Sequence, residues 1–209
     1  MMKLVEDIKN IYDEAKPLVE KRWSEFVELG KNGSEEELFS ELCFCILTAN
    51  WSAKGGIKAQ KEIGINGFIE LPLDELELAL RKVGHRFPRA RAQYIVSNRW
   101  IIGKIKPLFF LPYYHFREFI VNNIKGIGWK EASHFLRNIG YGDVAILDKH
   151  IMRLMLENQL IDEIPKGGWT KKRYLEYEKR LKVLEEYFNE PIGKLDLYLW
   201  YLVKKDVDK

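Results

Sequence analysis

Helical spacing of apolar residues runs through almost the whole chain, and this feature most constrains its fold. Most windows place apolar residues at positions i, i+3, i+4 and i+7, and none shows the signature of a β-hairpin. Prolines stand near the first turn of several of these stretches, a position that favours proline in helices. These prolines are Pro72, Pro88, Pro112 and Pro191. The spacing therefore predicts an all-α protein of roughly ten short helices.

The stretch after residue 34 predicts a central buried helix. Ser34 and Glu37 have the spacing of a capping box, and the segment Leu38–Leu47 that follows them is apolar nearly all round. Farther on, Thr170 opens a predicted long helix that carries aromatic residues on one side as far as Tyr187. The charged residues at the end of the chain are expected to be frayed and solvated.

Composition narrows the class of protein. A chain of 209 residues with 46% hydrophobic content can bury a core without disulfides. No apolar run is long enough to span a bilayer, and the first ten residues do not form a signal peptide, so we expect a cytoplasmic protein. The net charge of +3 is too small to indicate a nucleic-acid-binding protein by composition alone. A DNA-binding surface would have to be local.

Residues 124–132 (IKGIGWKEA) lie between two predicted helices and form the most informative stretch. Gly126 and Gly128 allow a sharp turn that aims backbone amides, together with the N-terminus of the next helix, at an anion. Ile127 would pack between the two helices. A helix-hairpin-helix motif binds a DNA phosphate in this way without reading sequence. Taken alone, the two glycines could also simply end one helix and start another.

Lys130 and Asp148 are the candidate catalytic residues. Lys130 falls in the first turn of the second helix, where the helix dipole opposes an ammonium, so its amine is a candidate nucleophile. In isolation, a lysine on a helix is more often a solvated charge or a phosphate contact. Asp148 ends the apolar run Val144–Leu147 and precedes another helix, which predicts an N-cap. A capping carboxylate is ionised and fixed, as stabilisation of a cationic transition state requires.

Together, Gly126–Lys130 and Val144–His150 resemble the signature of the helix-hairpin-helix DNA glycosylase superfamily. The separation of Lys130 and Asp148, 148 − 130 = 18 positions, is also similar to that of the family. The resemblance implies an all-α fold with two helical subdomains and a cleft between them. Members with a lysine at the position of Lys130 are bifunctional and cut first the glycosidic bond and then the DNA strand.

The cysteines help to choose a branch of this superfamily. The branches directed at pyrimidines and at adenine mismatches usually carry a C-terminal iron–sulfur cluster held by four cysteines, yet no cysteine follows Cys45. Other segments resemble the compact prokaryotic 8-oxoguanine DNA glycosylase/AP lyases. These segments are Phe44–Asn50, Gly84–Phe87, Ile124–Gly142, Tyr198–Tyr201 and the terminal lysine. Two alternatives stay open: a glycosylase for another oxidised base, and a non-catalytic helix-hairpin-helix DNA-binding module.

The resemblance implies a mechanism that uses no metal and no organic cofactor. Lys130 would attack C1′ of the damaged nucleotide while Asp148 stabilises the charge that develops on the sugar. The base leaves, a Schiff base remains, and β-elimination then breaks the strand. The implied partner is double-stranded DNA that contains 8-oxoguanine or an abasic site. No membrane partner is expected, and the enzyme would be a monomer that works at the nucleoid in the cytoplasm.

Several further residues are expected to handle the extruded nucleotide. By resemblance, Asn50 would fill the vacated space in the duplex, although an asparagine taken alone at this position more often ends a helix. Phe87 or His85 would act as a wedge beside Asn50. Arg86, with Arg89 and Arg91, would bind phosphates. The alternative is a basic loop whose aromatic residue lies in the core.

A second group is expected to recognise the base. By resemblance, Lys209 lines the base pocket through its side chain or its α-carboxylate, which would order the charged tail. Trp200 and His134, the latter one turn along from Lys130, are candidates to stack on the base, while Trp200 could equally be a core aromatic. The expected organisation is a central subdomain of residues 31–142 and a second one built from residues 1–30 and 143–209.

Overall fold

The computed structural model describes residues 2–209, which form helices joined by turns and loops, with no strand. The α-helices are α1 (Met2–Asn32), α2 (Glu35–Thr48), α3 (Ala53–Glu70), α4 (Leu73–Lys82), α5 (Pro88–Asn98), α6 (Tyr113–Asn123), α7 (Trp129–Asn138), α8 (Lys149–Glu157), α9 (Lys171–Leu181), α10 (Glu185–Phe188) and α11 (Ile192–Lys204). Three short 3₁₀ helices are η1 (Arg99–Ile101), η2 (Lys106–Phe110) and η3 (Lys182–Leu184). The predicted all-α class is confirmed.

The sequence predicts short helices throughout, but one of the helices is long. Helix α1 contains 31 residues and continues through Pro17. Its buried residues Leu4, Ile8, Ile11 and Ala15 recur every three or four positions, so one apolar face extends along the helix. Near the end of the chain, a helix is shorter than predicted. The long helix expected from Thr170 ends at Leu181 and is continued by η3 and α10.

Helix α2 is the central buried helix that the sequence predicts. The side chain of Ser34 accepts a hydrogen bond from the Glu37 amide at 3.1 Å, and the Glu37 carboxylate accepts one from the Ser34 amide at 2.7 Å. This capping box satisfies two amides at the start of the helix. Every residue from Leu38 to Thr48 is buried, because neighbouring helices cover all sides of α2.

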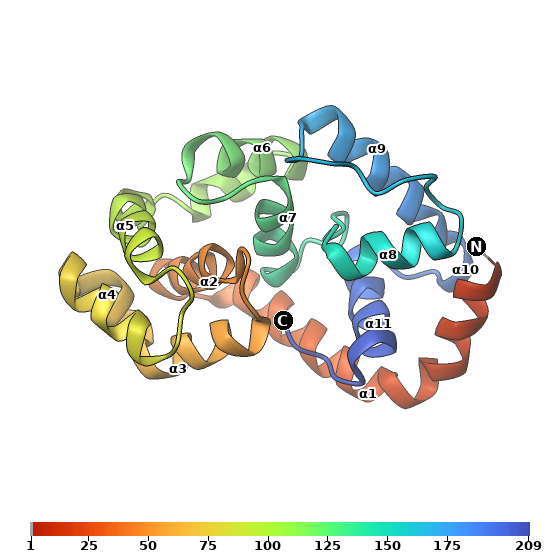
Figure 1. Cartoon of the computed structure of the whole chain (residues 1–209), viewed down its shortest axis with the longest axis horizontal. Helices are drawn as coiled ribbons and strands as arrows, with labels where there is room; N and C mark the ends of the chain where they lie inside the picture. The colour runs from red at the N-terminus through yellow and green to blue at the C-terminus, as the bar shows by residue number, and fades with distance from the viewer. Residues whose placement is uncertain (1) are drawn as a thin grey trace.

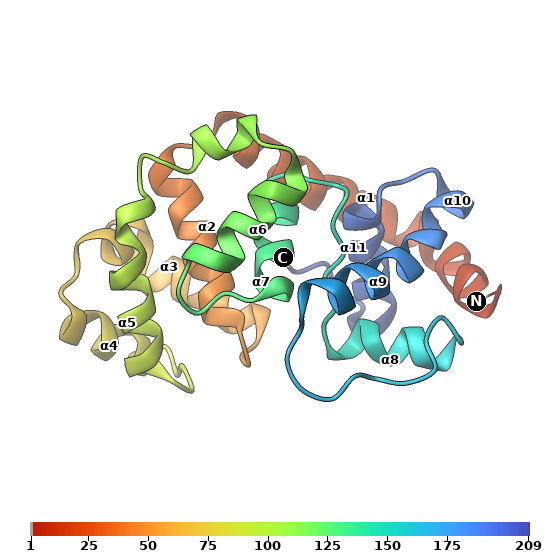
Figure 2. The ribbon, with the colours of Figure 1, turned by 90° about the horizontal axis from the view of Figure 1, so that it is seen from above.

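Buried apolar residues form two separate clusters. One contains residues of α2 to α7 and ends at Val144, and the other combines α1 and Trp129 of α7 with residues of the chain from Ala145 to Val207. Figures 1 and 2 show α2–α5 on one side of the molecule and α8–α11 on the other, with α7 between them. This partition supports the proposed division of the chain near residues 31 and 142, although residue 31 lies in the last turn of α1.

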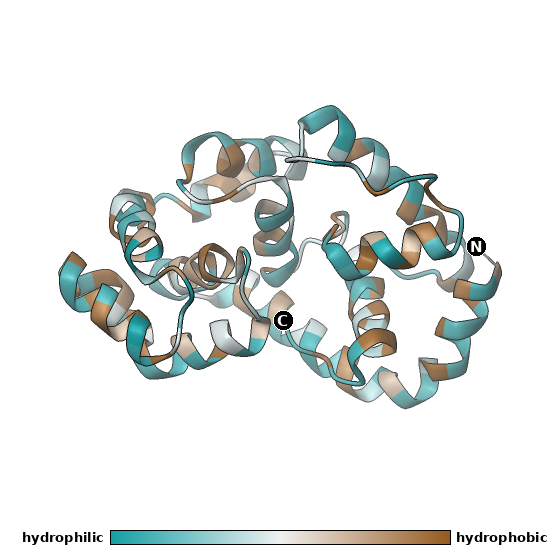
Figure 3. Cartoon of the chain, in the orientation of Figure 1, coloured by the Kyte–Doolittle hydropathy of each residue, from teal (hydrophilic) through white to brown (hydrophobic). Residues whose placement is uncertain are grey.

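The surfaces of the helices match this arrangement. Figure 3 shows apolar and polar bands alternating along individual helices, as expected where each helix has one face on a core and one on solvent. Within residues 2–209, no helix is both long and apolar enough to cross a membrane.

Candidate active site

A tight turn joins α6 and α7 at the predicted hairpin. Gly126 has φ +84°, and a Cβ atom there would lie 2.5 Å from the ring of Tyr94, so the position requires glycine. Gly128 is the N-cap residue of α7 and provides no side-chain cap, while Ile127 is buried beneath the turn. The amides at this helix start therefore remain suitable for a phosphate oxygen.

Asn98 braces this turn, a role that the sequence had not indicated. Its side-chain oxygen accepts a hydrogen bond from the amide of Lys125 at 3.0 Å, and its side-chain nitrogen donates one to the Lys125 carbonyl at 2.9 Å. Asn98 is fully buried at the end of α5. The hairpin thus has a fixed shape before any ligand binds.

Lys130 lies in the first turn of α7, as predicted. Its side chain is 23% exposed, and its Nζ lies 3.0 Å from Oε1 of Glu131. Glu131 follows it in the same turn and holds the amine of Lys130 in place. The prediction from the helix dipole had left this carboxylate out.

Asp148 is the N-cap of α8, which confirms the capping prediction. Its Oδ1 accepts hydrogen bonds from the amides of His150 and Ile151, both at 2.8 Å. These bonds fix the orientation of the carboxylate, because they commit one oxygen to the helix start.

Side chains from α9 hold the segment that leads to Asp148. The hydroxyl of Tyr174 donates to the carbonyl of Ala145 at 2.6 Å and accepts from the amide of Leu147 at 3.2 Å. Oε2 of Glu178 accepts from the amide of Ala145 at 2.9 Å and also pairs with the buried Arg117 of α6 at 2.7 Å. Desolvation raises the pKa of Tyr174, so its hydroxyl stays protonated and can donate. Asp148 is therefore positioned by buried contacts that extend through Tyr174 and Glu178 of α9 to Arg117 of α6.

One inner pocket brings most of the predicted site residues together. It has a volume of about 90 Å³ and is lined by Lys130, His134, Asp148, Trp200 and Lys209. These residues come from α7, the N-cap of α8, α11 and the C-terminal segment. The pocket opens into an outer cleft of about 1000 Å³, which Lys130, Asp148 and Trp200 also line. The nucleophile and carboxylate candidates thus meet in a cavity that is open on one side.

Asn50 and Arg86 line the outer cleft rather than the inner pocket. Asn50 directly follows the C-cap residue of α2 and has φ +60°, a conformation that asparagine tolerates better than most residues. Its place at the helix end and its exposure to the cleft are thus compatible with both expectations made from the sequence.

The two wedge candidates, both in the loop after α4, differ in their exposure to solvent. Phe87 is 41% exposed. His85 is only 5% exposed, its Nε2 lies 2.9 Å from the Leu47 carbonyl, and its Nδ1 accepts from the Phe87 amide at 2.9 Å. Burial lowers the pKa of His85, in keeping with a neutral ring. His85 therefore shapes the loop and leaves little surface for DNA, in contrast to the DNA contact expected from the sequence.

The arginines of this region also differ from the expectation. Arg89 forms ion pairs with Asp74 and Glu77 of α4, at 2.5 and 2.8 Å. Arg91 is buried and donates to the carbonyl of Ala49 at 2.7 Å. Of these three arginines, Arg86 alone is both exposed and without such an ion pair or hydrogen bond. Its guanidinium lies 5.2 Å from the centre of the Phe87 ring. Local positive charge is therefore smaller than the count of arginines predicts.

The charged tail is folded onto the protein rather than frayed. After α11 ends at Lys204, Val207 is buried and its carbonyl lies 3.4 Å from Nε of Arg22. The Nζ of Lys209 lies 2.7 Å from Oε2 of Glu41 and 4.6 Å from the centre of the Phe44 ring. These contacts bring Lys209 to the inner pocket.

The two stacking candidates have different surroundings. Trp200 is partly exposed, lines both cavities and packs edge-on against His150. His134 is buried, and its ring meets Phe44 edge-on with centroids 5.5 Å apart. Burial, Arg137 and Lys130 lower the pKa of His134 well below the ordinary value, so its ring is neutral at pH 7. Trp200 is the better placed of the two to stack on a base.

Residues that the sequence had not indicated complete the pocket. Asp196 lies beside Arg137 at 3.3 Å, and burial raises its pKa to about 7. Trp51 and Asp208 also line the wall. No cluster of histidine, cysteine, aspartate or glutamate in residues 2–209 has the geometry of a metal site.

An all-α fold, a helix-hairpin-helix turn, and a lysine and a capped aspartate that share one pocket define a DNA glycosylase of the helix-hairpin-helix superfamily. Comparison with known families makes the assignment more specific. The family model described as 8-oxoguanine DNA glycosylase matches residues 19–190. The chain belongs to this family.

Individual relatives agree over the whole chain. The 8-oxoguanine DNA glycosylase/AP lyase of Thermotoga maritima is 60% identical over 209 residues, which is the full length of both chains. The protein of the same name from Methanocaldococcus jannaschii is 53% identical over 204 residues, or 97% of this chain and 96% of the relative.

Solved structures show the same fold. The crystal structure of the 8-oxoguanine DNA glycosylase of Thermotoga maritima superposes with a TM-score of 0.97 at 60% identity, with both chains fully covered. The structure of the Methanocaldococcus jannaschii 8-oxoguanine glycosylase/lyase in complex with a 15mer DNA containing 8-oxoguanine gives a TM-score of 0.95 at 51% identity, again with full coverage.

Proposed function

We propose that this chain excises 8-oxoguanine from double-stranded DNA and then cleaves the strand at the abasic site. The observation that carries the proposal is the inner pocket, where Lys130 and Asp148 lie together with Trp200 and Lys209. The relatives described above, which match the whole chain, support the same activity. The substrate is DNA, and we expect the enzyme to act at the nucleoid in the cytoplasm.

The first step is nucleophilic substitution at the sugar. The unprotonated amine of Lys130 attacks C1′, the bond from C1′ to the base breaks, and the base leaves with the electron pair and takes up a proton. Positive charge develops on the sugar in the transition state, and the fixed carboxylate of Asp148 stabilises it. The amine loses its proton and the sugar ring opens, which leaves an imine between Nζ and C1′.

The second step breaks the strand. The protonated imine withdraws electrons from C2′, a proton is removed there, and the 3′ phosphate leaves by β-elimination. Water then hydrolyses the imine, restores the amine of Lys130 and releases the unsaturated sugar end. One lysine therefore serves both reactions, as covalent catalysis by an amine permits.

We assign recognition of the base to the inner pocket. 8-Oxoguanine carries an N7–H donor where guanine has an acceptor, so one fixed acceptor can distinguish the two bases. Lys209, which is paired with Glu41, and Trp200 both line the inner pocket, and Trp200 would offer an aromatic face to the extruded base. Neutral His134 completes the wall next to Lys209.

The DNA itself is bound by the hairpin and the rim of the outer cleft. Gly126 and Gly128 form the phosphate site, and Asn50 and Phe87 fill the space that the extruded nucleotide leaves. Arg86 contributes charge at the same rim. Extrusion costs a few kcal/mol, which these contacts have to offset.

A panel of duplexes tests this proposal against the other oxidised bases. Each duplex carries 8-oxoguanine, an oxidised pyrimidine, an unmodified guanine or an abasic site, and both the free base and the cut strand are measured. We expect release of 8-oxoguanine, followed by strand cleavage, and cleavage of the abasic duplex. Preferential release of an oxidised pyrimidine would reassign the substrate. Binding without release of any base would indicate a non-catalytic module.

A further inference from the structure

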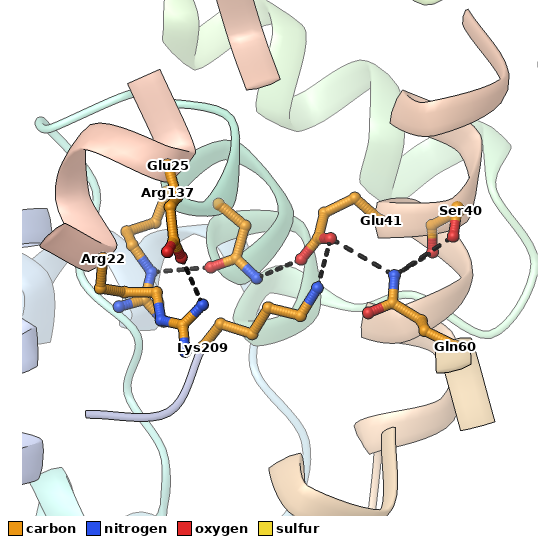
Figure 4. Close-up of polar contacts among 8 residues, drawn as sticks. Arg22, Glu25, Ser40, Glu41, Gln60, Arg137 and Lys209 are labelled. Atoms are coloured by element: carbon orange, nitrogen blue, oxygen red, sulfur yellow. Dashed lines mark hydrogen bonds and ion pairs between the residues drawn. The ribbon is translucent and has the colours of Figure 1, made fainter. Parts of the chain in front are cut away.

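Glu41 is a buried carboxylate in the middle of the apolar helix α2. It is 4% exposed. Its Oε1 accepts a hydrogen bond from Asn138 at 2.7 Å, and its Oε2 accepts one from Lys209 at 2.7 Å and another from Gln60 at 3.4 Å. Figure 4 shows the side chains of Lys209 and Gln60 pointing toward Glu41. Lys209 is the cation paired with this carboxylate, and 168 positions separate the two residues.

Burial of a carboxylate is unfavourable unless the charge is paired. Apolar neighbours surround Glu41 along α2, so an apolar residue would fit the helix better than a glutamate. The glutamate is therefore explained by its partner rather than by the stability of α2. The pair joins α2 to the tail segment that follows α11.

The pair of Glu41 and Lys209, called the anchor below, is connected to the floor of the inner pocket by hydrogen bonds. Asn138, which donates to Glu41, accepts a hydrogen bond from Nε of Arg137 at 2.9 Å. Arg137 in turn lies 3.3 Å from Asp196, and both of these residues line the inner pocket. Glu41 thus contacts Lys209 directly and reaches the floor of the pocket through two buried side chains.

We propose that Glu41 is a positioning residue for lesion recognition, because its carboxylate holds the side chain of Lys209 and thereby fixes that residue at the inner pocket. This inference rests on the proposed excision of 8-oxoguanine. Glu41 does not touch the base or the sugar. Through its ion pair with Lys209 it acts on excision of the lesion and not on cleavage of a sugar that has already lost its base.

The variant E41Q removes the charge and keeps the size of the side chain. We expect single-turnover excision of 8-oxoguanine to fall by about tenfold to 100-fold, because a small misplacement of a positioning group is amplified in the rate. Cleavage of a preformed abasic duplex should stay within about twofold of the wild-type rate. The matched control is E20Q, which breaks the 2.7 Å ion pair of Glu20 with Lys194 between α1 and α11, away from the pocket, and should change neither rate.

A double-mutant cycle shows whether Glu41 acts through Lys209. The variant K209M should reproduce the selective loss, and E41Q combined with K209M should be no slower than K209M alone. Additive losses would overturn the proposal. Equal losses of excision and abasic-site cleavage in E41Q would also overturn it, since they would indicate a general structural role.

A DNA-free measurement keeps the inference distinct from the proposed function. Carboxypeptidase B removes terminal basic residues, and a tail held by Glu41 should resist it. We expect E41Q to lose Lys209 about tenfold faster than wild type or E20Q, because an unanchored tail is open to the protease more of the time. Equal rates of Lys209 removal from E41Q and wild type would contradict the anchor, whichever lesion the enzyme excises. If E41Q fails to fold, E41D, which keeps the charge but shortens its reach, provides the same comparison and should lie between wild type and K209M in excision.

Discussion

Lys130 in the first turn of α7 and Asp148 at the N-cap of α8 line the same inner pocket, although 148 − 130 = 18 positions separate them in the chain. The chain between them turns at Gly140, which has φ +95° and passes so close to α1 that a Cβ atom would lie 3.0 Å from Cα of Val27. It then runs through the segment that Tyr174 holds by two hydrogen bonds. The relative placement of nucleophile and carboxylate is thus set by the packing of both clusters.

The variant D148N separates the charge of Asp148 from its capping role. Asparagine caps a helix about as well as aspartate, so the melting temperature should hardly change. Loss of the negative charge should lower the single-turnover rate of 8-oxoguanine excision by roughly 100-fold to 1000-fold. Excision at the wild-type rate in a folded D148N enzyme would show that the carboxylate does not stabilise the developing charge.

Phe87 and His85 should respond differently to truncation. In F87A the exposed ring is removed, so we expect stability within about 0.5 kcal/mol of wild type and weaker binding of duplexes that carry the lesion. In H85A the Leu47 carbonyl and the Phe87 amide lose their partner, which should cost about 1–3 kcal/mol of stability. Titration with DNA and thermal unfolding measure the two effects. Unchanged lesion binding in F87A would exclude it as the wedge.

Gly126 should be intolerant of any side chain. In G126A the new methyl group meets the Tyr94 ring at a backbone angle that L-residues rarely adopt. We expect a general loss of affinity for duplex DNA at unchanged preference for the lesion, because hairpin contacts to phosphates carry no sequence information. The control is G168A, where nothing lies within 4 Å of the added carbon. Selective loss of lesion binding in G126A would place the hairpin in base recognition instead.

Buried His134 predicts a dependence of stability on pH. Its pKa in the folded protein lies well below the ordinary 6.5, so below about pH 6.5 the unfolded chain binds a proton that the folded protein does not. Stability from this group is therefore present above pH 6.5 and is lost as the pH falls towards the folded pKa, by up to about 1.4 kcal/mol per pH unit.

Denaturant unfolding between pH 4.5 and 7.5 tests this prediction. The variant H134Q should show a shallower loss of stability on acidification, although His85, whose pKa is also lowered, keeps part of the slope. The exposed control H115Q retains His134 and should keep the full slope. An identical slope in wild type and H134Q would contradict the assignment of a neutral buried ring.

Local sequence patterns were sufficient to predict the elements whose signals span a few residues. The capping box of Ser34 and Glu37, the hairpin around Gly126 and the N-cap role of Asp148 all depend on neighbours within one turn of helix. The spacing of apolar residues predicted the helical class for the same reason. The uninterrupted length of α1 depends on its packing against α11 and was not predicted.

Contacts between distant residues could not be predicted in this way. The partners of Arg89 and Arg91 come from α4 and from the end of α2, so composition overestimated the free positive charge of the loop. The bond between Glu41 and Lys209 likewise joins segments far apart in the chain. The sequence signals this bond only by an acidic residue inside an otherwise apolar run. Such a pattern does not show which residue pairs with it.

Borohydride trapping on DNA that contains 8-oxoguanine tests the central claim most directly. Reduction of the imine should link wild-type enzyme covalently to the DNA at Lys130, and mass spectrometry of the linked peptide should identify that residue. The variant K130Q should give no linked product and no strand cleavage. A link formed as efficiently by K130Q, or one that maps to another lysine, would contradict the mechanism.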